Sequence, residues 1–315
     1  MPIADRTIRV QCCGNTGGGY TTLNNIAADP GPVAVRPRNV EFNCSGAPLQ
    51  WIPGHPVSSH FVSAFNLILP ECEEWFVRVF SEALGHVDDE ILRETMRGFI
   101  GQEAQHSRVH GNVLDTFFAE NGVDTTEFTG QMRWVFRRVL RIPSRLSARR
   151  RRKHLISQLW LIAAIEHFTA IFGDFLLNNS WEEYGAHPGL VDIYRWHGAE
   201  EVEHRCVAHD VATYFGDGPL RRFWAMLAAF PLIISVVIRG VHLINTGENS
   251  GAPKSEIAMW RALHADAELG LAPDFGRVLR SVLTFVGPGY NPEDVGSTAQ
   301  AVAYLSRMHV TRVAS

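Results

Sequence analysis

The sequence predicts an all-α protein built on a four-helix bundle with additional C-terminal helices. Three observations support this fold class. Four long segments repeat apolar residues at steps of three and four, which is the period of an amphipathic helix. Strand patterns are nearly absent from the chain, and each of the four long segments carries a carboxylate near its middle.

The first elements in chain order are irregular. Residues 1–35 are rich in glycine and turn formers without any periodicity, so we expect an irregular N-terminal arm. An extended stretch with a Pro-Gly-His-Pro turn should follow up to Pro56. We then expect one domain over residues 36–315, with a core bundle over about 59–214 and accessory helices over 220–315.

Helices are expected wherever the apolar period is sustained. Asp88 is a reasonable N-cap for the second long helix, and the Asn121-Gly122 pair is a reasonable stop. The four long helices are expected at 59–84, 88–121, 147–178 and 188–214, and shorter ones near 255–268, 274–285 and 294–309.

Composition excludes several classes of protein. With 315 residues and 46% apolar residues, the chain can bury a large core without disulfides. The net charge of −4 gives no general case for nucleic-acid binding. Five cysteines without a Cys-x-x-Cys pair argue against a disulfide framework or a thiolate zinc site and fit a reducing compartment. Because the N-terminus also lacks a signal-peptide pattern, we expect a cytoplasmic protein.

One segment is unusually apolar. Residues 223–238 contain no charge and are flanked by arginines, but they are shorter than a membrane span and contain Pro231. We expect a buried, kinked core helix. A helix that lines an apolar substrate channel, or one that dips into a membrane surface, remains an alternative.

A second segment is unusually basic. From Phe128 to Ile165 the chain holds ten basic residues and no acid, so the rest of the chain carries −14. Such a run is often only a solvated surface. Its other interpretation is a docking site over residues 133–153 for an acidic carrier protein, a coenzyme A tail or anionic lipid.

The midpoints of the four long helices carry the chemistry. Residues three, four or seven positions apart share one helix face, so the second and fourth helices each align a Glu-x-x-His pair with a further histidine. The first and third helices each add a single glutamate. The candidate metal ligands are Glu73, Glu103, His106, His110, Glu166, His197, Glu201 and His204.

The order of these residues repeats along the chain. Glu73 precedes the pair Glu103 and His106 by 30 residues, and Glu166 precedes the pair Glu201 and His204 by 35. One glutamate from each of two helices plus Glu-x-x-His from each of the other two is the pattern of ferritin-like di-iron or di-manganese bundles. We therefore expect a ferritin-like bundle with two metal ions.

Some assignments leave alternatives open. We prefer Glu73 over Glu74, and Glu201 over Glu200 because only Glu201 has the following histidine. His110 and His197 are candidates either for additional ligands or for hydrogen-bonded neighbours of the ligands. His167 points about 100° away from Glu166, so we expect it to pack elsewhere.

Four blocks of sequence resemble, in order, the bacterial family of predicted metal-dependent hydrolases. They are WIPGHPVSSHFVSAFNLILPECEEWF, FIGQEAQHSRVH, AAIEHFTA and WHGAEEVEHRCVAHD, within residues 35–214. The family pattern Pro-x-Gly-Glu falls on Pro70, Cys72 and Glu73, with Cys72 in place of the usual glycine. The resemblance implies that Glu73 is the first metal ligand.

The ligand set favours oxygen chemistry. Carboxylate-rich sites with one histidine per metal suit iron or manganese. We therefore expect two Fe ions, or Mn in their place, and a non-haem oxygenase or oxidase that uses O₂ to N-oxygenate, hydroxylate or desaturate a small organic or acyl substrate. In this interpretation Glu103 and Glu201 bridge the metals.

Two other functions compete with the oxygenase. A dinuclear hydrolase uses the same kind of site to generate hydroxide, and a ferritin-like shell would store metal. The sequence leaves the substrate, a peripheral membrane contact and a homodimer open.

Overall fold

The computed structural model describes residues 33–143, 145–216, 218–246 and 251–313. Over these residues the protein is all-helical and contains no strand. The expected N-terminal arm lies outside the described residues except for its last three.

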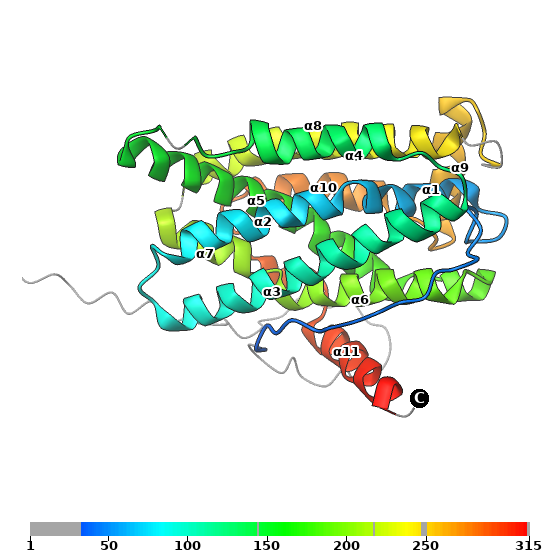
Figure 1. Cartoon of the computed structure of the whole chain (residues 1–315), viewed down its shortest axis with the longest axis horizontal. Helices are drawn as coiled ribbons and strands as arrows, with labels where there is room; N and C mark the ends of the chain where they lie inside the picture. Colours follow the sequence, from blue (N-terminus) through cyan, green and yellow to red (C-terminus); the bar gives the residue numbers. More distant parts are fainter. Residues whose placement is uncertain (1–32, 144, 217, 247–250, 314–315) are drawn as a thin grey trace, which may run out of the picture.

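Four helices form the core around the predicted site. They are α2 (Leu69–Leu84), α3 (Glu90–Val113), α5 (Ala148–Asn178) and α6 (Pro188–His204). Helix α2 packs along α3, and α5 packs along α6; the two pairs meet where α2 contacts α5 and α3 contacts α6 (Figure 1). The carboxylate-bearing helices therefore face one another, as the sequence pattern requires.

Two of the four expected long helices are interrupted. The first is divided into α1 (Pro56–Ser63), a 3₁₀ turn (Ala64–Leu67) and α2, because Pro70 lacks an N–H and favours a new helix start. The fourth ends at His204, and α7 (Val207–Gly216) continues after a break. The N-cap of α3 is Asp89 rather than Asp88, and its carboxylate accepts a hydrogen bond from the Leu92 N–H.

The basic segment contains a helix that the sequence analysis did not predict. Helix α4 (Thr126–Trp134) continues into a π-helical turn (Val135–Val139). Arg133 and Arg137 of this element form ion pairs with Glu71 of α2 at 3.1 and 2.6 Å. These pairs fix part of the positive charge against the bundle.

Glycines allow α5 and α6 to approach closely. A Cβ atom at Gly198 would lie 2.7 Å from Cβ of Leu176 and 3.0 Å from the carbonyl oxygen of Gly173. A Cβ at Gly173 would lie 3.0 Å from Cβ of Glu201. This contact brings α6 and its metal-site residues against α5.

An extended N-terminal strap crosses α3. Residues 33–42 run along the bundle, and Val35 and Pro37 fit against Gly98 and Gly101 (Figure 1). A Cβ at Gly98 would lie only 2.1 Å from the Val35 carbonyl oxygen. The strap thereby carries Arg38 to the edge of the site.

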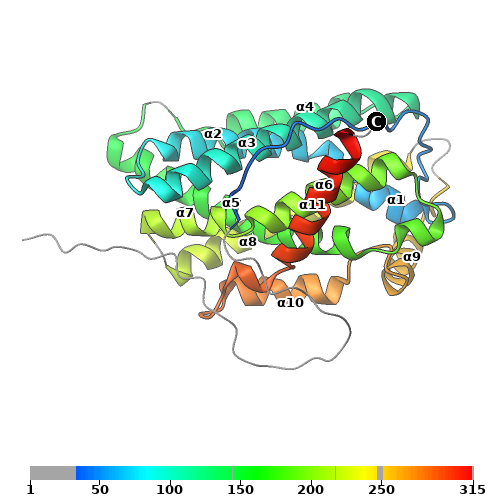
Figure 2. The same cartoon turned by 90° about the horizontal axis from the view of Figure 1, so that it is seen from below.

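The C-terminal helices cover the bundle. Helix α8 (Pro219–Asn245) and α10 (Phe275–Val286) pack on α5, α9 (Glu256–Glu268) lies against α1, and α11 (Thr298–Val313) crosses α6 (Figure 2). The three short helices expected after residue 250 are therefore present, with shifted ends.

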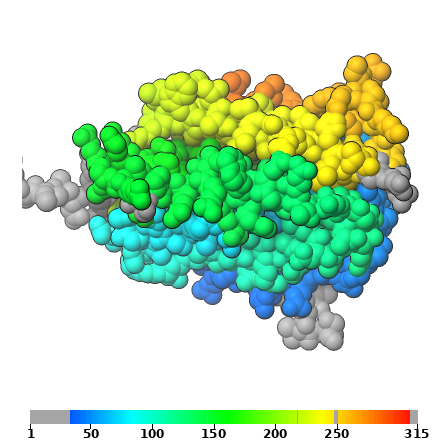
Figure 3. Space-filling model, turned by 45° about the horizontal axis from the view of Figure 1, so that its top comes forward, coloured from blue at the N-terminus to red at the C-terminus, as the bar shows by residue number. Residues whose placement is uncertain are grey.

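Helix α8 is not the buried core helix that residues 223–238 predict. Its inner side packs on the core, whereas Trp224 and Leu227 are more than half exposed on its outer side. Helices α5 and α8 are long and apolar enough to cross a membrane by length and composition alone, but 67% of the apolar window of α5 is buried, against 28% in α8. In space-filling form α8 lies beside α4 on one face of the molecule (Figure 3).

Candidate metal centre

The structure brings all eight predicted ligands together in the interior. Each is at most 4% exposed. They come from α2 (Glu73), α3 (Glu103, His106, His110), α5 (Glu166) and α6 (His197, Glu201, His204).

One group of donors surrounds His204. Its Nε2 atom lies 3.3 Å from Glu103, 3.2 Å from Glu166 and 3.3 Å from Glu201. One donor atom from each of these four residues lies within 4.8 Å of the others. Three carboxylates and one imidazole around a common point are a suitable ligand set for a divalent cation.

A second group shares Glu103 with the first. Glu73, Glu103 and His106 again place one donor atom each within 4.8 Å of the others. Nδ1 of His106 lies 3.5 Å from Glu201, which also belongs to the first group. Glu103 and Glu201 thus stand between two adjacent sets of donors.

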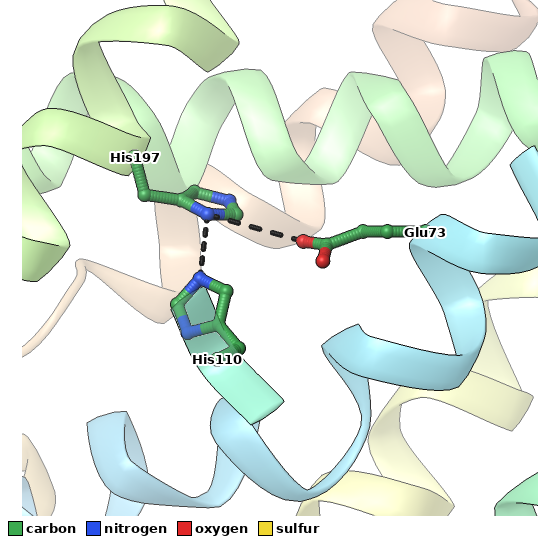
Figure 4. Close-up of side chains that lie close together, drawn as sticks. All are labelled: Glu73, His110 and His197. Carbon is green, nitrogen blue, oxygen red and sulfur yellow. Dashed lines mark hydrogen bonds and ion pairs between the residues drawn. The ribbon is translucent and has the colours of Figure 1, made fainter. Parts of the chain in front are cut away.

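A histidine pair borders Glu73 (Figure 4). Nε2 of His110 lies 2.7 Å from Nδ1 of His197, and that Nδ1 atom lies 3.9 Å from Glu73. Nε2 of His197 lies 3.0 Å from Glu201. The pair therefore borders Glu73 of the second donor group and Glu201 of the first.

Hydrogen bonds determine how this pair is protonated. The Asn66 amide donates to the Ser63 carbonyl and the Tyr194 hydroxyl, so its oxygen accepts from Nδ1 of His110 at 2.7 Å. With its proton on Nδ1, neutral His110 accepts at Nε2 from the N–H at Nδ1 of His197. Nε2 of His197 is then its second ring nitrogen, 3.0 Å from Glu201.

Unpartnered polar atoms test whether a metal fits. Among the described residues, both carboxylate oxygens of Glu73 and Glu103, one oxygen of Glu166 and Nδ1 of His106 are buried without a hydrogen-bond partner. Buried carboxylate oxygens are costly to leave unpaired. Four buried carboxylates match the charge of two divalent cations, so the donor set fits the metal pair.

The same burial perturbs the acidities of the metal-free site. Burial, followed by the negative charges of neighbouring glutamates, raises the pKa of Glu73 and Glu103 well above 4.5, and it raises the pKa of Glu166 to about 7. Burial also acts to raise the pKa of Glu201, but His204 and His197 lower it well below its ordinary value. Without a metal, several of these carboxyl groups are therefore hard to ionise. A bound cation would favour their ionised form.

In each of the two histidines of the Glu-x-x-His pairs, His106 and His204, the ring nitrogen that points away from the metal site has a hydrogen-bond partner. Nε2 of His106 lies 3.0 Å from Glu200, and Nδ1 of His204 lies 3.0 Å from the amide oxygen of Gln102. Partners of this kind fix the ring orientation of metal-binding histidines. They leave Nδ1 of His106 and Nε2 of His204 facing the site.

Arg38 connects these two partners. Its guanidinium donates to Glu200 at 2.8 Å and forms two 2.8 Å hydrogen bonds to Glu203, which also accepts from Gln102 at 2.6 Å. The sequence analysis missed Arg38, Gln102 and Glu203 and set Glu200 aside as a ligand. Glu200 is only one position from Glu201, but Arg38 is 162 residues away from Glu200, so no local pattern reveals the connection.

Other residues weighed from the sequence lie away from the donors. Glu74 is exposed and pairs with Arg78 at 3.0 Å. His167 contacts the Ser281 carbonyl of α10 at 3.0 Å and the hydroxyl of Tyr290, which follows α10, at 3.1 Å.

Comparison with protein families gives one match. The model of a family described as "Predicted metal-dependent hydrolase" matches residues 36–296. No curated protein and no solved structure matches the chain.

The family match overturns the predicted oxidoreductase. The oxygenase or oxidase interpretation is wrong, and the hydrolase that stood as its alternative is the supported class. The prediction failed because carboxylate and imidazole donors around two ions serve both redox and hydrolytic chemistry, so the ligand types alone do not distinguish them.

Proposed function

The chain belongs to the family of predicted metal-dependent hydrolases, and from its buried glutamate–histidine centre we propose that it hydrolyses its substrate with two divalent metal ions. The observation that carries this proposal is the set of buried carboxylate oxygens without hydrogen-bond partners. Leaving such oxygens ionised and unpaired in a protein interior is costly, and a bound cation removes that cost.

The two donor groups assign the ligands. Glu166 and His204 would hold one ion, and Glu73 and His106 the other. Glu103 and Glu201 would contribute oxygens to both, because they lie between the groups. When bound, such a pair supplies Lewis acidity and a nucleophilic hydroxide at neutral pH. The carboxylate-rich set favours Mn²⁺ or Fe²⁺.

Within this site, His197 is placed to move the proton. His110 and Asn66 fix its Nδ1–H, so Nε2, 3.0 Å from Glu201, would be the atom that passes a proton between the attacking water and the leaving group once Glu201 is engaged as a metal ligand. His110 orients His197 through this hydrogen bond. In this assignment both histidines support the ligands rather than bind metal.

The arrangement of the core supports a ferritin-like bundle. Two helix pairs, α2–α3 and α5–α6, each contribute one glutamate and then a Glu-x-x-His pair. Their similar order suggests a duplicated hairpin, which is the architecture of carboxylate-bridged dinuclear proteins.

The basic segment also has a proposed role. A cleft beside α2 is lined by four arginines and two glutamates, and its wall includes Trp75, two residues after Glu73. The charged residues are Arg78, Arg137, Arg138, Arg141, Glu74 and Glu82, so the arginines are in excess. Arg138 and Arg141 have no ion pair within the described part of the chain. We place an acidic group of the substrate here, such as the phosphate of coenzyme A or of a carrier protein.

Metal content and hydrolysis test the proposal together. Protein loaded with Mn²⁺ should bind two ions per chain and hydrolyse members of a panel of carboxylic esters, thioesters and phosphate esters. Glu103→Gln should lose both the metal and the activity, whereas Glu94→Gln, an exposed glutamate on the same helix, should keep both. A folded protein that binds no metal, or a two-metal protein inactive on every class, would overturn it.

A further inference from the structure

An apolar cavity ends at the candidate metal centre. It has a volume of about 160 Å³ and lies between α2, α5, α8 and α10. Its inner end includes Cys72, His110 and His197, so it directly adjoins Glu73 and the histidine pair. Its remaining walls are almost entirely aliphatic and aromatic.

Aromatic rings make up much of the wall. Phe65 stacks on Phe172 with ring centroids 4.3 Å apart, and Phe61 contacts Phe275 edge-to-face at 5.8 Å. Protein cores normally leave few spaces larger than a water molecule. An apolar cavity of about 150 Å³ stays dry and takes up a ligand such as benzene. This space therefore has the character of a site for an apolar group.

The cavity reaches the surface beside α8. Phe230, Ile233 and Val237 line it from the inner side of that helix, while Leu232 and Ile234 line it and are each 37% exposed. Helix α8 lies on the face shown in Figure 3. An apolar chain can thus enter along α8 and extend inward until it meets His197.

We propose that the substrate of this hydrolase carries an apolar chain, aliphatic or aromatic, that fills this cavity while its scissile bond lies at the metal centre. The position of the scissile bond in this inference rests on the proposed function. The binding of the apolar chain rests only on the cavity. Polar walls would favour a sugar or peptide, but apart from the histidine pair and Cys72 the lining includes only two residues with hydroxyl groups, Thr169 and Tyr194.

Ligand binding to metal-free protein tests the chain site apart from catalysis. In calorimetric titrations with acetate, butyrate, octanoate and dodecanoate, each added methylene should tighten binding by up to about fourfold until the cavity is full. Ile233→Trp should fill the space and weaken dodecanoate binding at least tenfold. Leu227→Trp, on the exposed side of the same helix, is the matched control and should bind like the parent.

Folding and activity separate the outcomes. Circular dichroism should show that Ile233→Trp is folded, and Ile233→Phe offers a smaller filling variant if it is not. Binding that is independent of chain length, or unaffected in a folded filling variant, overturns the chain site. If long chains bind but the metal-loaded protein hydrolyses no long-chain ester, the hydrolase fails and the chain site stands. If short and long esters are hydrolysed equally well, the hydrolase stands and the chain site fails.

Discussion

At the scale of single residues, Arg38 holds together two histidines that lie on different helices. Through Glu200 it reaches His106, and through Glu203 and Gln102 it reaches His204. Its side chain is only 19% exposed, so its loss would leave two buried carboxylates without their cation. The strap thus takes part in the metal centre without contacting it.

This network predicts that Arg38→Met weakens metal binding. Loss of a partner that orients a metal-binding histidine costs 10- to 100-fold in affinity, so we expect a loss of about that size, measured by competition with a chelator. Arg36→Met, at an exposed position two residues away, should bind like the parent. Equal affinity of both variants would show that the network does not orient the ligands.

The acidity of Glu166 gives a prediction about pH. Burial and the charge of Glu201 raise its pKa from 4.5 to about 7 in the metal-free protein, so the folded state holds a proton that the unfolded chain has released. The free energy of unfolding of metal-free protein should therefore fall as the pH rises from about 4.5 to about 7. Metal needs the ionised carboxylates, so its stabilising effect should grow over the same range.

Thermal unfolding checks this expectation. The difference in Tm between Mn²⁺-loaded and metal-free protein should be larger at about pH 8 than at about pH 5, as linkage requires. In the metal-free Glu166→Gln variant, the free energy of unfolding should fall less steeply with rising pH than in the parent. A Tm difference that does not change with pH would contradict the raised pKa.

At the scale of elements, the glycine contact between α5 and α6 determines where Glu201 lies relative to Glu166. Gly198→Ala places a methyl group 2.7 Å from Cβ of Leu176, so the helices must separate by several tenths of an ångström. We expect destabilisation of about 1–3 kcal/mol, typical of overpacking, and weaker metal binding.

The control for this substitution lies on another helix. Gly130 of α4 has nothing within 4 Å of its added Cβ, so Gly130→Ala should be neutral or stabilising by up to about 1 kcal/mol. Chemical denaturation and metal titration of both variants give the comparison. Full metal affinity in Gly198→Ala would show that the close approach is not needed.

The helices also show which parts of the fold the sequence could predict. Periodicity located the helices that carry the glutamates, and the spacing of Glu103 and His106 or Glu201 and His204 placed each pair on one face, because helical geometry is local. It did not reveal helix α4, because this nine-residue helix buries only Phe128 and Met132, which is too few apolar residues to show a period. It missed Arg38 for a different reason, since that contact depends on how distant segments pack.

At the scale of the whole molecule, two surfaces of opposite character flank the site. The apolar cavity lies under α8, the arginine-lined cleft lies beside α2, and Phe136 lines both. A molecule with an apolar chain and an acidic group could therefore place its chain in the cavity and its acidic group in the cleft, on either side of Phe136. The distribution of charge supports this arrangement, since ten basic residues gather in one segment of a chain that is otherwise acidic.

This geometry predicts a salt-dependent contribution to binding. Reversing Arg138 and Arg141 together to Glu should weaken binding of dodecyl phosphate strongly at low salt and much less at high salt, because ions screen exposed charges beyond about 10 Å at 0.1 M ionic strength. Binding of the uncharged alcohol dodecanol should not change, since its chain contacts only the cavity. Reversal of Arg149 and Arg150, exposed on the first turn of α5 and outside the cleft, is the matched control. If both reversals weaken binding of dodecyl phosphate equally, the attraction comes from the whole basic segment and not from the cleft. If neither reversal weakens it, the acidic group binds elsewhere.

Neither pair of arginines lies among the metal ligands, so the metal content should stay at two ions in every variant. The test of the cleft is therefore independent of the metal centre.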